Sequence, residues 1–482
     1  MLTAGRDEGG CWCAGAGFGT PFAVASFERR GERVTFDLLG ARSGTVEAPV
    51  GGGAEMDILE LSSRMIDSGE LIESPMRITN ELSEVAPGVA LVESYSNVVA
   101  VGTDEGLVVF DASGIETGPA VVASLRRWTN DPVHTIVYTH GHVDHVGGSG
   151  AFVADAQRRR HAPPRVVGHE NVPRRFQRYR EMDAWNVRIN LRQFGGIRPQ
   201  RGLQLVVDGE FLARDVAECS EIYSERLSLS VGGRRIELHH GLGETDDHTW
   251  GWLPDIGAVS TGDFFTWVFP NAGNPQKVQR FPLEWAKALR AMIAMEPELL
   301  LPAHALPVVG VERICGVLDT VASMLEQLVA EVVEAMNAGA TLDEILAAVK
   351  VDESLLALPY LRPVYDEPEF VIRNVWRLYG GWWDGNPARL KPPTDGSLSR
   401  EIAGLAGGLT ALVERAQELS TAGDHRLACQ LIEYARGAAP DDSSVATAYR
   451  DIYLGRRKAE SSLMSKGIYA DAARRTTIHT DG

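Results

Sequence analysis

The stretch THGHVDHVGG, residues 139–148, holds three of the chain's 12 histidines together with an aspartate. His140 and His142 are two residues apart, so in extended backbone their side chains point the same way and can share one metal ion. Asp144 and His145 follow where the chain has turned, and they can reach a second ion. Imidazole and carboxylate ligands suit Zn²⁺, or Fe or Mn if more oxygen ligands join. The pattern therefore predicts a metal site.

The segments around this stretch predict an α/β body. Residues 133–139 are rich in β-branched residues and predict a strand that ends at the motif. We expect Gly141 to let the chain leave this strand in an unusual conformation. Residues 118–128 predict a helix. Further short apolar runs, bounded by turn residues, predict strands over 89–92, 97–101, 107–111, 227–231, 235–239, 249–253 and 258–261.

The two ends of the chain differ from this body. Beyond residue 311 the apolar residues follow helical periodicity over 317–336, 342–349 and 402–419, which predicts an all-helical C-terminal part. Residues 1–77 are mixed in character and contain glycine-rich patches. The run 34–39 predicts one strand there. We expect this region to be weakly structured or to wrap onto the body.

Composition limits the classes of partner. The chain has 482 residues, enough for two or three domains, and 65 acidic against 47 basic residues give a net charge of −18. This charge disfavours nucleic acid and anionic membranes as partners. No run of about 18 apolar residues predicts a membrane span, and the N-terminus has no apolar signal segment. Five scattered cysteines form no disulfide framework, which indicates a reducing compartment, the cytoplasm.

The stretch 139–148 resembles the signature of the metallo-β-lactamase fold, an αββα sandwich of hydrolases with a one- or two-metal site at one sheet edge. The resemblance implies further ligands downstream. Glu244 stands where most of this superfamily has histidine, and a glutamate there resembles the alkyl sulfatase branch. Asp263 closes a strand like the residue that bridges two metals, and His304 lies in a turn similar to the family's last ligand turn. The implied set is His140, His142 and Glu244 on one ion, Asp144, His145 and His304 on a second ion, and Asp263 between them.

The helical part resembles the same branch. Residues 374–387 contain the run YGGWWDGNP, which is similar to a motif of the alkyl sulfatase dimerisation domain. The resemblance implies a homodimer. It divides the chain into an N-terminal extension (1–77), a metallo-β-lactamase-like catalytic domain (78–310) and a helical dimerisation domain (311–475).

The sequence also departs from the alkyl sulfatases. They carry glutamate where Asp263 stands, and a histidine and an arginine in the following segment, to hold the sulfate and protonate the leaving oxygen. Here residues 264–277 contain no histidine or arginine. We expect the anion to be held by Asn271, Asn274, Lys277 and Arg280, none of which is a convincing general acid. His248 or His169 could substitute, although each is also compatible with a structural role.

The missing acid favours C–O cleavage, because sulfate is a weak base and leaves without a proton. The aromatic residues of 264–269 fit either an alkyl-chain pocket or the core. The sequence thus predicts a dinuclear metal hydrolase, with Asp144 and Asp263 among the catalytic residues. Its two ions, roughly 3.5–4 Å apart, would activate a bridging hydroxide. The expected substrate is an alkyl sulfate. The alternatives are another ester, a lactone, a thioester or a phosphodiester as substrate, or a dimeric scaffold without activity.

Overall fold

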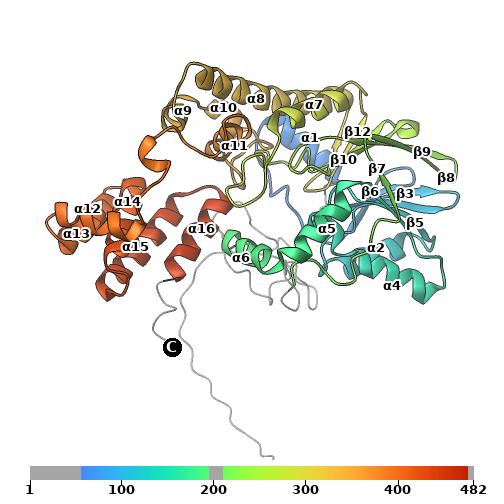
Figure 1. Cartoon of the computed structure of the whole chain (residues 1–482). Helices are drawn as coiled ribbons and strands as arrows, with labels where there is room; N and C mark the ends of the chain where they lie inside the picture. The colour runs from blue at the N-terminus through green and yellow to red at the C-terminus, as the bar shows by residue number, and fades with distance from the viewer. Residues whose placement is uncertain (1–55, 195–209, 476–482) are drawn as a thin grey trace, which may run out of the picture.

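A computed structural model describes residues 56–194 and 210–475 of the chain. Two β-sheets face each other (Figure 1). The first sheet is antiparallel from β1 to β4 and parallel from β4 to β7. Its strands, in spatial order, are β1 (Leu82–Ala86), β2 (Val89–Val92), β3 (Val98–Thr103), β4 (Gly106–Phe110), β5 (Val133–Val137), β6 (Arg165–His169) and β7 (Glu221–Tyr223).

The second sheet runs in the order β13-β12-β11-β10-β9-β8. All its neighbours are antiparallel except β11 and β12, which are parallel. The strands are β8 (Arg226–Val231), β9 (Arg234–His240), β10 (Thr249–Leu253), β11 (Ala258–Gly262), β12 (Leu299–Pro302) and β13 (Val308–Val309). The strands predicted from the apolar runs lie within two residues of the observed bounds.

Both faces of the first sheet are buried, which explains its nearly continuous apolar strands. Along β3, Val99 and Val101 join the core shared with the second sheet, whereas Val98 and Ala100 join a separate core. Helices α2 (Gly118–Trp128), α4 (Ser149–Arg159) and α5 (Asn171–Glu181) cover that outer core. Helices α7 (Pro282–Ile293) and α8 (Val311–Asn337) cover the second sheet (Figure 1). The arrangement confirms the predicted αββα sandwich.

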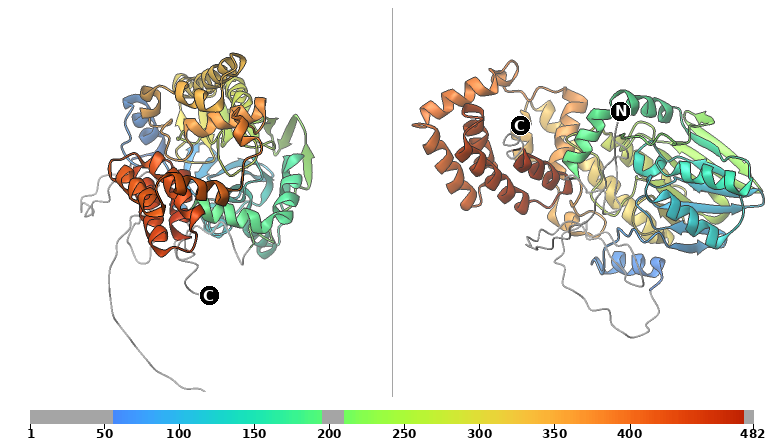
Figure 2. Two further views of the ribbon diagram at one scale, coloured as in Figure 1. Left: turned by 60° about the vertical axis from the view of Figure 1, so that its left-hand side comes forward. Right: turned by 90° about the horizontal axis from the view of Figure 1, so that it is seen from below.

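The helices after α8 fall into two groups. The first group, α9 (Leu342–Ala348), α10 (Glu353–Ala357) and α11 (Pro368–Gly380), packs against the core of the sandwich. The second group has a core of its own and lies to one side of the sandwich (Figures 1 and 2). It consists of α12 (Asp395–Leu405), α13 (Leu409–Thr421), α14 (His425–Ala438), α15 (Ser443–Ala459) and α16 (Leu463–Arg474).

One helical prediction was wrong in its continuity. The periodic run 402–419 is divided between α12 and α13 instead of forming one helix. The break lies at Gly407 and Gly408, whose φ angles of 88° and 118° are incompatible with a right-handed helix. The apolar periodicity continues across the break because both helices face the same core.

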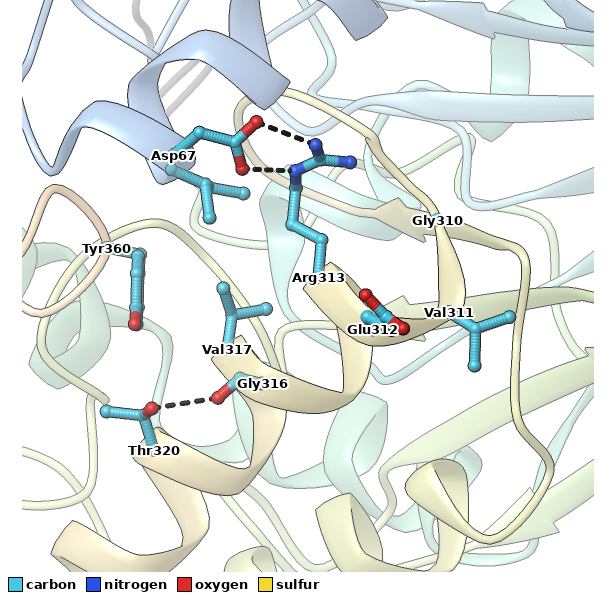
Figure 3. Close-up of a pocket in the computed structure, with 10 residues that line it drawn as sticks. Asp67, Gly310, Val311, Glu312, Arg313, Gly316, Val317, Thr320 and Tyr360 are labelled. Carbon is cyan, nitrogen blue, oxygen red and sulfur yellow. Dashed lines mark hydrogen bonds and ion pairs between the residues drawn. The ribbon is translucent and has the colours of Figure 1, made fainter.

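The described part of the N-terminal region packs onto the body. In α1 (Ile58–Ser68), Ile58, Leu61 and Met65 join the main core. Asp67 accepts two hydrogen bonds from Arg313 at the start of α8, at 2.7 and 2.8 Å (Figure 3). This pair lies in an open hollow of about 650 Å³ between the two helices. The predicted strand 34–39 lies outside the described residues. Among the described helices, none has the length and apolar character that a bilayer crossing requires.

The C-terminal helix α16 returns to the sandwich, where it packs on α6 (Asp183–Gln193) (Figure 1). Gly467 is buried at this contact, and a Cβ there would overlap the main-chain carbonyl of Gln193. An ion pair between Arg192 and Asp471, at 3.6 Å, flanks the same contact. The close approach of the two helices therefore requires glycine.

We predict that Gly467→Ala lowers the free energy of unfolding by about 1–3 kcal/mol, because the added methyl group must push two packed helices apart. Gly404→Ala is the matched control, since a Cβ at this helical glycine has nothing within 4 Å. It should cause no loss of stability. Thermal unfolding of both variants is the measurement, and equal melting temperatures would contradict the described contact.

Candidate metal centre

Seven potential ligands gather at one edge of the sandwich. Each follows the carboxyl end of a strand: β5 precedes the 139–148 stretch, β9 precedes Glu244, β11 precedes Asp263 and β12 precedes His304. The potential ligand atoms form two groups, and within each group all of them lie within 4.8 Å of one another. The first group comprises His140, His142, Glu244 and Asp263, and the second comprises Asp144, His145 and His304. The structure thus brings together every residue that the sequence suggested as a metal ligand.

In the first group the donor atoms converge closely. His140 Nε2 lies 2.8 Å from His142 Nδ1 and 3.8 Å from Asp263 Oδ2. His142 Nδ1 lies 3.5 Å from Glu244 Oε1. Ligand atoms of a tetrahedral zinc with 2.0–2.2 Å bonds are roughly 3.3 Å apart, so this spacing fits a shared ion.

Asp263 also reaches the second group. Its Oδ2 lies 3.5 Å from His145 Nε2, and its Oδ1 lies 3.5 Å from His304 Nε2. Asp144 Oδ2 is 3.5 Å from His145 Nε2 and 3.4 Å from His304 Nε2. The carboxylate of Asp263 therefore lies between the two groups.

The electrostatics of the cluster also fit a cation. His145 Nε2 and Asp263 Oδ1 are buried and have no hydrogen-bond partner. Burial, together with the nearby carboxylates of Asp263 and Asp144, raises the pKa of Glu244 to about 8 against the opposing effect of Arg280. Burial disfavours the charge of Asp263, but the neighbouring His145 and His304 outweigh burial and lower its pKa. Crowded carboxylates and unpartnered buried donor atoms make this a candidate site for divalent metal.

Asp111, directly after β4, holds the ligand loop from behind. This buried carboxylate accepts hydrogen bonds from the backbone N–H (2.7 Å) and hydroxyl (2.8 Å) of Thr139. Its Oδ2 lies 2.8 Å from His145 Nδ1, which leaves the other ring nitrogen facing the cluster. Our sequence reasoning placed Asp111 at the end of a strand but gave it no role. Its position at the end of a strand, like that of the candidate ligands, was the sequence feature that could have indicated a role in the site.

The loop between β9 and β10 is held by an ion pair. Arg175 of α5 donates from Nε to Asp247 at 2.7 Å, and its Nη2 donates to the carboxylate of Asp246. Asp247 also accepts the backbone N–H of Gly141 at 3.0 Å. A Cβ on Gly141 would lie 2.8 Å from the Arg175 side chain. Glycine is thus needed there for close approach and not, as expected from the sequence, for an unusual backbone angle, since Gly141 is not among the residues with positive φ.

The residues expected to hold the anion divide into two sets. Asn271 donates to Glu244 Oε1, and Asn274 donates to Asn271 at 3.4 Å. Arg280 donates to the backbone carbonyl of Glu244 and lies 3.3 Å from its carboxylate. These three residues brace Glu244. Lys277 instead donates to Asn190 Oδ1 of α6, at 3.1 Å.

The two histidines suggested as acids lie outside the ligand groups. His248 is fully buried, and its Nε2 accepts the backbone N–H of Asp263 at 3.1 Å. Burial lowers the pKa of His248 to about 3. His169 stacks on His240, with ring centroids 3.8 Å apart, and its Nδ1 accepts the N–H of Asn171. Both rings thus occupy supporting positions behind the loops.

The aromatic segment after β11 belongs to the core. Phe264, Phe265, Trp267 and Phe269 are all buried within the main apolar cluster. Trp267 also donates its indole N–H to the carbonyl of Leu306 at 2.8 Å. Of the two interpretations that the sequence left open, the structure favours core packing.

Helix α6 supplies a polar wall that the sequence did not reveal. Its buried side chains include Asn186, Asn190 and Gln193, which follow helical spacing and face inward. Gln193 donates to the hydroxyl of Tyr365 at 2.8 Å. Burial raises the pKa of Tyr365, and the charges of Glu244 and Asp144 act in the same direction, so this phenol lies within electrostatic reach of the cluster.

We predict that Asp111→Asn weakens metal binding about 10–100-fold, because His145 loses the carboxylate that orients its ring. The measurement is competition with a chromophoric chelator on protein of known metal content. Asp246→Asn serves as the control, since this carboxylate is half-exposed and contacts no ligand. Unchanged affinity in Asp111→Asn would show that His145 needs no such support.

We also predict that Asp247→Asn destabilises the fold by about 3 kcal/mol, because it removes the buried partner of a buried guanidinium. Asp246→Asn should cost at most about 1 kcal/mol. The side chains are 0% and 48% exposed, respectively, and pair with the same Arg175. Urea unfolding of both variants gives the comparison, and equal losses would contradict it.

The same pair has a predictable pH dependence. Burial disfavours the charge of Asp247, but Arg175 outweighs burial and lowers the pKa of this carboxyl. Its stabilisation is therefore complete above the unfolded pKa of about 3.9 and is lost as the pH falls below that value. The stability difference between the wild type and Asp247→Asn should shrink in acid.

Comparison with known proteins agrees with this geometry. Residues 91–304 match the family model of the metallo-beta-lactamase superfamily, and residues 341–477 match that of alkyl sulfatase dimerisation. A linear primary-alkylsulfatase from a Pseudomonas species is 26% identical over 359 residues, covering 70% of this chain and 66% of that protein. An (R)-specific secondary-alkylsulfatase, also from a Pseudomonas species, is 26% identical over 377 residues, covering 73% of this chain and 55% of that protein. The chain thus spans less than two thirds of the length of these relatives.

A solved structure shares the fold. The stereoselective inverting secondary alkylsulfatase of a Pseudomonas species superposes with a TM-score of 0.72 at 24% identity. The match covers 82% of this chain and 65% of that one. Together with the two family matches, this likeness shows that the chain contains a metallo-beta-lactamase fold followed by a region that matches alkyl sulfatase dimerisation, and that it is similar to the alkyl sulfatases.

Proposed function

We propose that the protein is a metal-dependent hydrolase of alkyl sulfate esters. The observation that carries this proposal is the seven-ligand cluster with glutamate at position 244, in a chain whose two parts match the metallo-beta-lactamase superfamily and alkyl sulfatase dimerisation. The named activities of the relatives support the same substrate class.

The cofactor we propose is a pair of Zn²⁺ ions, with Fe or Mn as the alternative metals. His140, His142 and Glu244 would hold one ion, and Asp144, His145 and His304 the other, with Asp263 between them. Such a pair supplies a hydroxide at neutral pH when bound. The protein's own contribution is to fix the ligand loops through Asp111 and the pair of Arg175 and Asp247.

The substrate would be a small anionic ester. Arg280 lies 3.3 Å from the carboxylate of Glu244, and the charges of Arg280 and Lys277 both act on the cluster, although the chain as a whole carries a net charge of −18. Their charges act on His142, whose pKa is lowered first by burial and then by these neighbours among others. A sulfate group would find its positive partners on this side of the site.

A homodimer is proposed for the helical region. Residues 341–477 match the dimerisation family, and the same region exposes large apolar side chains, including Trp382 (73% exposed) and Leu405 (78% exposed). The division of the chain after residues 77 and 310 stays a prediction. So does the cytoplasmic location, with which the three free cysteines of the described residues are compatible.

The test is a substrate panel on protein of counted metal content, with and without chelator. The panel contains primary and secondary alkyl sulfates, a p-nitrophenyl phosphodiester, a lactone and a thioester. We expect sulfate release from the alkyl sulfates that is lost with chelator and in His140→Ala and is kept in Asp246→Asn. Sedimentation velocity on the same samples should give a dimer.

Two outcomes would contradict the proposal. Turnover of another ester with inert sulfates would retain the metal site and replace the substrate class. Protein that binds no metal and hydrolyses nothing would favour a scaffold.

A further inference from the structure

The outer face of α6 combines basic and apolar side chains. Trp185, Arg188 and Arg192 follow one another at spacings of three and four residues, so they form one stripe along the helix. Trp185 is 48% exposed, and Leu191, three residues after Arg188, is 46% exposed. Arg188 is exposed as well, whereas Asn190 on the other side of the helix is buried. The outer face therefore presents large apolar groups and guanidinium groups to solvent side by side.

Helix α16, which packs on the end of α6, extends the positive part of this face (Figure 1). Asp471 pairs with three arginines: Arg475 at 2.8 Å, Arg192 at 3.6 Å and Arg474 at 3.7 Å. The side chains of Arg474 and Arg475 remain 45% and 46% exposed. With Arg188, four guanidinium groups share this one carboxylate, on a chain whose net charge is −18. The junction of the two helices is thus locally cationic.

The charges of this junction act on one another. Burial lowers the pKa of Arg192, and Arg475 and Arg188 act in the same direction, against Asp471. The helix dipole favours cations near a C-terminus, which accounts for Arg192 and Arg474 in the last turns of α6 and α16. It does not account for Arg188 in the middle of α6 or for the exposed indole one turn before it. Crowded like charges repel one another, and an anionic partner would relieve that repulsion.

The inner side of the same helix belongs to the candidate metal centre. Gln193 donates to the hydroxyl of Tyr365 at 2.8 Å, and Asn190 accepts a hydrogen bond from Lys277 at 3.1 Å. A helix with its side chains is about 10–12 Å in diameter. The cationic and apolar surface is therefore separated from the polar wall of the site by the width of one helix.

We propose that Trp185, Arg188, Leu191, Arg474 and Arg475 form a surface that docks the protein onto aggregates of its alkyl sulfate substrate, an inference that rests on the proposed function. Alkyl sulfates are amphiphiles that assemble with their sulfate groups outward and their alkyl chains inside. The arginines pair with the sulfate groups. Trp185 and Leu191 insert between the chains, as apolar side chains of amphipathic helices do at an anionic interface. Docking thereby brings concentrated substrate to the helix that forms the wall of the site.

The experiment measures binding separately from turnover. Neutral phosphatidylcholine vesicles are doped with a long-chain alkyl sulfonate, which presents the same kind of anionic group but lacks the ester oxygen and is not hydrolysed. Flotation of the full chain gives the bound fraction. The variants are Trp185→Ser and a double variant that combines Arg188→Gln with Arg475→Gln. Ile72→Ser and Arg415→Gln are the matched controls, since these side chains are 47% and 60% exposed and lie on other elements.

We expect the wild type to float with the doped vesicles but not with undoped ones, and to detach as the salt concentration rises. The double variant should bind about 10–30-fold more weakly, because two charges are removed from the interface. Trp185→Ser should bind about 10-fold more weakly, because it loses apolar contact with the chains. Both controls should bind like the wild type, and all melting temperatures should agree.

Turnover of a hydrolysable alkyl sulfate provides a second readout. Both surface variants should keep the wild-type rate on monomeric substrate and lose the added rate above the critical micelle concentration, because only docking is impaired.

Four results would overturn the docking surface. One is binding that survives both changes. Another is tighter binding to phosphatidylglycerol vesicles of equal charge, which would assign the surface to a membrane. A third is a large fall in melting temperature in the surface variants, which would assign these residues to the fold. The fourth is a wild type that hydrolyses monomeric alkyl sulfates but does not float, and this result would leave the proposed function intact. A wild type that floats but hydrolyses no alkyl sulfate would instead remove the proposed function.

Discussion

Three carboxylates and four imidazoles share one buried edge of the sandwich, and this crowding is the constraint that the surrounding structure must satisfy. Without a cation, Glu244, Asp263 and Asp144 cannot all ionise freely, because they lie close together at a largely buried edge; the raised pKa of Glu244 reflects burial and the charges of the other two carboxylates. Neighbouring groups reduce the imbalance, since Arg280 pairs with Glu244 and His145 opposes the charge of Asp263. The edge nevertheless favours bound metal ions, because two buried atoms that could coordinate them, His145 Nε2 and Asp263 Oδ1, have no hydrogen-bond partner.

The two sheets hold this edge rigid through hydrogen bonds at the ends of their strands. Asn97, just before β3 in the first sheet, donates to the carbonyl of Pro302 at the end of β12 and to that of Ala305 in the loop after it, at 3.1 and 2.7 Å. The backbone N–H of Thr249 donates to the carbonyl of Thr139 at 2.6 Å. Loops from both sheets thus meet at fixed distances. Ligands that are more than a hundred residues apart in sequence can therefore share one site.

The helical region also takes part in the site. Tyr365 lies between α10 and α11, and Gln193 of α6 donates to its hydroxyl. Helix α16 packs on the end of α6 through Gly467, so the last helix of the chain supports the wall that contains Asn190. A region that matches a dimerisation family is thereby connected to the buried polar side chains of α6.

The sequence by itself predicted most strand and helix positions from local spacing, and its resemblance to the metallo-β-lactamase signature implied the αββα class and the seven candidate ligands, because short motifs at strand ends carry that resemblance. The tertiary structure decided the pairings. Asp111 supports His145, Arg280 braces Glu244 instead of standing free, and residues 264–269 lie in the core. Lys277 and Asn190 are 87 residues apart, and no periodic pattern relates them. Such contacts depend on how distant segments pack against each other, and only the folded chain specifies that arrangement.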